Sequence, residues 1–211
     1  MSQNAAFQMA QLTIGKVKVP SVLFQRLILN NNDNLVARYA TKAASDQEGN
    51  RNTKWYQLSG VGKATVVSMK TDTGHVLSSD VPKNMGGTNL HPQPVEHLLA
   101  ALVGCEQVTA TYVGRSMNRR LLIDRIEFDI SANRDARGAL QQPIDDIPPI
   151  PARVQQVSGI VKVFVKDGRV LSEEELKLLK HQTEARCPVA NMMVASGCDM
   201  LVEWKDGNAS D

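Results

Sequence analysis

Residues 95–116 read VEHLLAALVGCEQVTATYVGRS, and this stretch decides the fold that we predict. Its apolar side chains recur at helical spacing, with Leu98, Leu102 and Cys105 on one stripe. The stretch carries no charge between positions 98 and 105, which is typical of a helix that is buried on most sides. We therefore expect a long central helix over these residues, with a cysteine on its apolar face.

A second cysteine lies in the segment EARCPVANMM, residues 184–193. Pro188 cannot donate the next helical hydrogen bond but suits the first turn of a new helix, so we expect one helix to end and another to begin here. Cys187 would then lie near the N-cap of the second helix, beside Arg186. The positive end of the helix dipole predicts a stabilised thiolate at Cys187.

The remaining patterns predict strands and one further helix around these two segments. Ser172 and Glu175 form a capping box that opens a helix running to Arg186. A turn at TDTG makes a hairpin of the first two strands. Strands are predicted at 55–71, 75–82, 121–133, 158–168 and 198–205, with irregular loops at 83–94 and 134–156. This order indicates an α+β fold.

The composition of the chain is that of an ordinary globular protein, and it excludes several classes. A net charge of +2 is too small to favour nucleic acid or an anionic membrane, and no apolar run reaches the roughly 18 residues of a membrane span. Three cysteines are too few for a secreted disulfide scaffold and favour a reducing compartment, the cytoplasm. The N-terminus of the chain is poor in acidic residues, and this is the one feature that is typical of a mitochondrial transit peptide. We divide the chain into an N-terminal extension, residues 1–55, and one domain, residues 56–211.

Several roles are open for the thiols. A two-thiol redox centre of Cys105 and Cys187 is the leading hypothesis, because an oxidised thiolate needs a second thiol to resolve it. The alternative is that both are buried core cysteines, as we expect for Cys198. Zinc could use cysteine with His97 or His181, but no CxxC or HxxxH pair occurs, so we predict no metal. A reactive Cys105 would need a cation from elsewhere in the fold.

The segments GGTNLHPQPVEHLLAALVGC, residues 86–105, and CPVANMM, residues 187–193, resemble the OsmC/Ohr family of thiol-dependent hydroperoxide reductases. The resemblance implies antiparallel sheets around a long buried helix, in an intertwined homodimer with active sites at the interface. It also implies a peroxidatic Cys105 and a resolving Cys187, an organic hydroperoxide as substrate, a dithiol reductant such as a lipoyl group, and no cofactor.

Two positions depart from the hydroperoxide reductases of this family. Their hairpin arginine is absent, because the corresponding turn reads MKTDTG and offers Lys70. Their glutamate directly follows the proline that opens the central helix, whereas here Glu96 follows Pro94 by two positions. Other branches of the family carry the later glutamate, so the chain looks more like an OsmC-like relative. We expect Lys70 or another basic residue to supply the missing positive charge and Glu96 to orient it.

The sequence thus predicts a two-cysteine peroxidase that reduces organic hydroperoxides in oxidative stress defence. The rival hypothesis keeps the dimer but not the peroxidase. A lysine is a point charge without the bidentate fork of arginine. In that case the interface cavity would bind an apolar ligand or partner, and Cys105 would serve packing.

Overall fold

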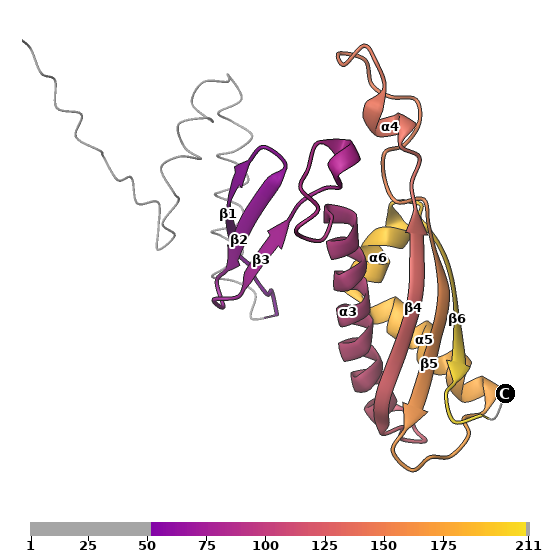
Figure 1. The fold of residues 1–211 in the computed structure, drawn as a ribbon. Helices are drawn as coiled ribbons and strands as arrows, with labels where there is room; N and C mark the ends of the chain where they lie inside the picture. The colour runs from indigo at the N-terminus through magenta and orange to yellow at the C-terminus, as the bar shows by residue number, and fades with distance from the viewer. Residues whose placement is uncertain (1–51, 210–211) are drawn as a thin grey trace, which may run out of the picture. The chain divides into compact units, whose positions relative to one another are not determined.

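The computed structural model describes residues 52–209 (Figure 1). Almost all of the predicted extension, residues 1–55, therefore lies outside the described residues. The chain divides into two compact units, and the larger unit, residues 59–70 and 74–211, contains nearly every described element. Within the described part of the chain, no helix combines the length and apolarity that crossing a membrane requires.

The first sheet has three strands in the order β1 (Leu58–Lys63), β2 (Val66–Thr71) and β3 (Val76–Ser79). The single strand predicted over 55–71 is wrong, because the chain turns at Ala64, whose φ is 53°. The predicted hairpin is confirmed between β2 and β3, which pair antiparallel.

The loop between β3 and the central helix is built around the buried carboxylate of Asp80. That carboxylate accepts hydrogen bonds from the backbone N–H groups of Val81, Thr88 and Leu90, and from the hydroxyls of Thr65 and Thr88. The Thr88 hydroxyl is the largest of the influences that hold the pKa of Asp80 well below its usual range. The loop also contains a short 3₁₀ helix, η1 (Lys83–Met85), where we predicted irregular structure.

The central helix, α3 (Pro94–Ser116), is confirmed. A capping box opens it: the Glu96 carboxylate accepts a hydrogen bond from the Gln93 N–H at 2.7 Å. Less of the surface of α3 is buried than predicted. In the single chain Val108 is 70% exposed and Tyr112 is 64% exposed. One stripe of α3 packs into the core and another faces outward.

The second sheet contains β4 (Ile123–Asn133), β5 (Gln156–Val165) and β6 (Asp199–Asp206) in that order. β4 and β5 pair antiparallel, but β5 and β6 pair parallel. The implied all-antiparallel arrangement is therefore wrong for this sheet. Parallel neighbours need a crossover connection, and the helix pair between β5 and β6 provides it.

That crossover consists of α5 (Glu173–Arg186) and α6 (Pro188–Ala195). The predicted capping box of α5 is confirmed, with the Glu175 N–H donating to the Ser172 hydroxyl at 3.2 Å. A short helix, α4 (Arg137–Leu140), lies in the region predicted as loop.

The core lies between the second sheet and the three helices α3, α5 and α6, which cover one of its faces (Figure 1). Alternate residues of β5 point into it, and Val157, Val161 and Val163 are fully buried. This layer fixes α3 against α5 and α6, the elements that position the two cysteines.

Candidate functional site

Cys105 and Cys187 meet where α3 packs on the junction of α5 and α6. Cys105 lies in the middle of α3 and is partly exposed, whereas Cys187 ends α5, caps α6 and is fully buried. Both thiols are free, and Cys105 lies near enough to Cys187 to raise its pKa. Two residues 82 positions apart in the sequence are therefore neighbours in the fold.

The surroundings of Cys187 favour the thiol over the thiolate. Its Sγ accepts a hydrogen bond from the Ala190 N–H at 3.4 Å, as an N-cap side chain does. Burial nevertheless raises the pKa of Cys187 to about 11, and Cys105 adds to the rise. The predicted thiolate at this helix start is wrong, because desolvation of the sulfur outweighs the helix dipole. Cys187 is protonated at neutral pH.

The other two predicted site residues lie in different settings. Lys70 is exposed on β2, where it pairs with Val76 of β3. Glu96 lies nine residues before Cys105, or about 13 Å along the helix axis. Its carboxylate is engaged in the capping box with Gln93. No ion pair joins Lys70 to Glu96 among the described residues.

One buried ionisable residue beside the thiols was missed by the sequence reasoning. Glu106 follows Cys105 directly and is only 3% exposed. Burial raises the pKa of Glu106 to about 7, and Glu184 on α5 adds to the rise while Lys180 opposes it. The signal was present in the sequence, because Glu106 lies four residues from both Leu102 and Ala110 on the buried stripe.

The remaining cysteine and histidine residues do not extend the site. Cys198 is buried in the core, as predicted. The Nε2 of His97 lies 2.9 Å from the Ser78 carbonyl oxygen and joins the start of α3 to β3. Across residues 52–209 no three histidine, cysteine or acidic side chains gather in a way that could hold a metal ion.

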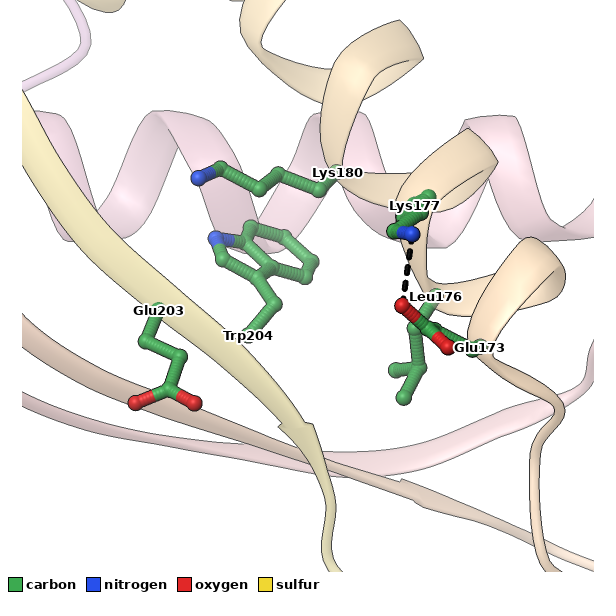
Figure 2. A pocket seen from close by; sticks show the side chains of 6 residues that line it. All are labelled: Glu173, Leu176, Lys177, Lys180, Glu203 and Trp204. Atoms are coloured by element: carbon green, nitrogen blue, oxygen red, sulfur yellow. Dashed lines mark ion pairs between the residues drawn. The ribbon is translucent and has the colours of Figure 1, made fainter.

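A pocket of about 340 Å³ opens between α5 and β6 (Figure 2). None of the predicted site residues lines it. Lys180, which lines the pocket, also makes two polar contacts. Its Nζ donates a hydrogen bond to the Val202 carbonyl oxygen at 2.7 Å and lies 3.8 Å from the Glu184 carboxylate. The lining side chains are Glu173, Leu176, Lys177, Lys180, Glu203 and Trp204.

Comparison with known proteins identifies the fold that holds the two thiols. The family model described as OsmC-like protein matches residues 87–203, more than half of the chain. The chain belongs to the OsmC-like protein family. The matched region of this OsmC-like chain includes Cys105, Glu106 and Cys187 but not the first hairpin, so Lys70 lies outside it.

Solved structures share the fold of this OsmC-like chain at low sequence identity. An OsmC-like protein from Mycoplasma pneumoniae is 19% identical, with a TM-score of 0.56 over 72% of this chain and 96% of its own. An OsmC-like protein of unknown function from Vibrio cholerae is 12% identical, with a TM-score of 0.58 over 72% and 99%. An organic hydroperoxide resistance protein OsmC from Legionella pneumophila is 14% identical, with a TM-score of 0.54 over 74% and 99%. No curated protein sequence matches the chain.

Proposed function

We propose that this OsmC-like protein is a cytoplasmic two-cysteine peroxidase that reduces organic hydroperoxides with electrons from a dithiol. The observation that carries the proposal is the proximity of the Cys105 and Cys187 thiols where α3 packs on the α5–α6 junction. Membership of a family with organic hydroperoxide resistance proteins among its solved structures supports the same chemistry.

The first step assigns the attack to Cys105. Its thiolate sulfur attacks one peroxide oxygen, so that an S–O bond forms, the O–O bond breaks and the alkoxide leaves as an alcohol after taking a proton. Cys105 becomes a sulfenic acid. The assignment rests on access, because Cys105 is partly exposed whereas Cys187 is fully buried.

The second step assigns resolution to Cys187. Its sulfur attacks the Cys105 sulfenic acid, an S–S bond forms, and the hydroxyl leaves as water with the proton that Cys187 carried. Because its raised pKa keeps Cys187 as a thiol, the residue must lose its proton as the sulfur attacks, and this proton leaves with the water. An external dithiol then reduces the disulfide.

The proposal includes a positively charged side chain that stabilises the Cys105 thiolate. Lys70 is the candidate cation, because it occupies the hairpin position at which the resemblance implies an arginine. Glu96 would act on the cation only at a distance from Cys105, since its carboxylate already closes the capping box of α3. We expect a slow enzyme, because the single ammonium group of a lysine cannot hold a thiolate and a peroxide as the guanidinium of an arginine does.

The test measures peroxide consumption by the reduced protein with a dithiol. Cumene hydroperoxide should be consumed faster than hydrogen peroxide, because apolar residues such as Leu98 and Val108 are exposed on the helix of the nucleophile. Cys105→Ser should abolish turnover, and Cys187→Ser should react once and stop at a sulfenic acid that mass spectrometry detects. Cys198→Ser is the matched control and should retain turnover.

A wild-type rate equal to that of Cys105→Ser with both peroxides would contradict the peroxidase. The alternative is then an OsmC-like dimer that binds an apolar ligand or partner at its interface. One observation favours it: α3 exposes Val108 and Tyr112 in the single chain. Binding of an apolar fluorescent probe that a Val108→Asp variant loses would support this alternative.

A further inference from the structure

We propose that Glu106 is a positioning residue for the thiol pair: the charge on its carboxyl group sets how closely α3 approaches α5, and through that spacing how readily Cys105 and Cys187 join. The inference rests on the proposed function in taking these two cysteines as the redox pair. Glu106 itself touches neither substrate nor reacting atoms in this scheme.

The geometry places two interacting pairs on the same two helices. On α3, Cys105 and Glu106 are consecutive residues. On α5, Glu184 lies three residues before Cys187, one helical turn away on the same face. The thiol pair and the carboxyl pair thus both bridge α3 and α5, so a change in spacing at one pair is felt at the other.

The charges around Glu106 are few and come from α5. They are Lys180 and Glu184, with His181 acting on Glu184. On α3 the other titratable residues near Glu106 are Cys105 and Tyr112, and the nearest charged or histidine side chains, His97 and Arg115, are nine positions away. The helix α6 has no titratable residue besides its cap, Cys187. The strand β4 also packs on α3, but its charged side chains are exposed. They are Asp124, Arg125, Glu127 and Asp129.

One ammonium group therefore serves two carboxyl groups, the buried Glu106 and the half-buried Glu184. Lys180 lies 3.8 Å from Glu184 and is also bound to the Val202 carbonyl. Burial raises the pKa of Glu106 to about 7, so its carboxyl changes charge in the neutral range. When Glu106 is ionised, two carboxylates face each other across the helix packing, and separation of α3 from α5 relieves their repulsion and admits water. A greater separation of the two helices disfavours formation of the Cys105–Cys187 disulfide.

The consequence is measurable as a pH dependence of disulfide formation. In exchange with glutathione disulfide, the two cysteine thiols become one disulfide and two glutathione thiols form. The two protons pass from the cysteines to glutathione. No net proton is taken up or released below the thiol pKa values, so the equilibrium constant is independent of pH there unless another group titrates. Glu106 is that group in our proposal.

The experiment measures this constant at pH 6 and pH 8 in a Cys198→Ser background, where only one intramolecular pair can form. We expect the parent constant to fall about fivefold as the pH rises, the lower end of ordinary coupling between sites. Glu106→Gln should remove the fall. Glu203→Gln, whose side chain is 64% exposed, is the matched control and should keep it.

A parent constant that is flat between pH 6 and pH 8, or a fall that persists in Glu106→Gln, would overturn the inference. So would a parent protein that forms no disulfide at any pH. Glu184→Gln keeps the test valid if Glu106→Gln does not fold: loss of the like charge should make the fall smaller and move it to lower pH. The assay uses no peroxide, so absence of peroxidase turnover does not affect it.

Discussion

At the scale of single residues, the buried acids of this chain differ in how their charge is compensated. Asp80 accepts hydrogen bonds from three backbone N–H groups and two hydroxyls. Glu175 accepts two hydrogen bonds from the Arg169 guanidinium, both at 2.8 Å. Glu106 has only a lysine shared with Glu184. The pKa values follow this order, since the first two are lowered and that of Glu106 is raised.

We predict from this difference that Glu106 destabilises the fold at neutral and alkaline pH. Its folded pKa, about 7, exceeds the ordinary value of 4.5, so its stabilising contribution is complete below about pH 4.5 and is lost as the pH rises through 7. The loss is on the order of 3 kcal/mol. Urea unfolding should therefore show Glu106→Gln gaining stability over wild type between pH 5 and pH 8. A difference that does not change with pH would contradict this.

Glu175 should behave in the opposite way. Its bidentate pair with Arg169 is the largest cause that lowers the pKa of Glu175 to about 2, so its stabilising contribution is present above about pH 4.5 and is lost as the pH falls toward 2. We expect Glu175→Gln to lose about 2 kcal/mol of unfolding free energy at pH 7. Glu173→Gln breaks only an exposed ion pair with Lys177 and should lose less than about 0.5 kcal/mol. Equal losses in the two variants would refute the assignment.

At the scale of elements, the loop before α3 depends on one close approach. A Cβ added at Gly87 would overlap the Val81 carbonyl oxygen and crowd the Asp80 carboxylate. We therefore expect Gly87→Ala to lower the melting temperature by several degrees, as a loss of about 1–2 kcal/mol does in a domain of this size. Gly74→Ala is the control for a glycine at positive φ without close neighbours. An unchanged melting temperature in Gly87→Ala would show that the loop accommodates the added Cβ.

At the scale of the whole molecule, the outward stripe of α3 predicts a homodimer. Val108 and Tyr112 are exposed on the longest helix of the described residues, and apolar residues grouped on one face of a helix mark a surface that binds a partner. Sedimentation at micromolar concentration should give twice the mass of one chain. Val108→Asp with Tyr112→Asp should shift the protein toward monomer, whereas Ile160→Asp on the open face of the second sheet should not. A monodisperse wild-type monomer would refute the intertwined dimer.

The sequence alone determined the elements whose signals are local. The apolar spacing of α3, the Ser172–Glu175 capping box and the proline after Cys187 act through neighbours three or four residues away, so each could be predicted. The OsmC-like fold followed from two motifs that flank the cysteines. The turn at Ala64 escaped prediction because a non-glycine residue adopts a positive φ there.

Only the tertiary structure decided the chemistry of the buried groups. At Cys187 the local signal, a helix start beside an arginine, predicts a thiolate, but burial by distant elements keeps the thiol. At Glu106 the sequence shows an acid on an apolar stripe, while its partners on α5 lie more than 70 positions away. Desolvation is set by every element that packs around a group, and the sequence near that group does not contain this information.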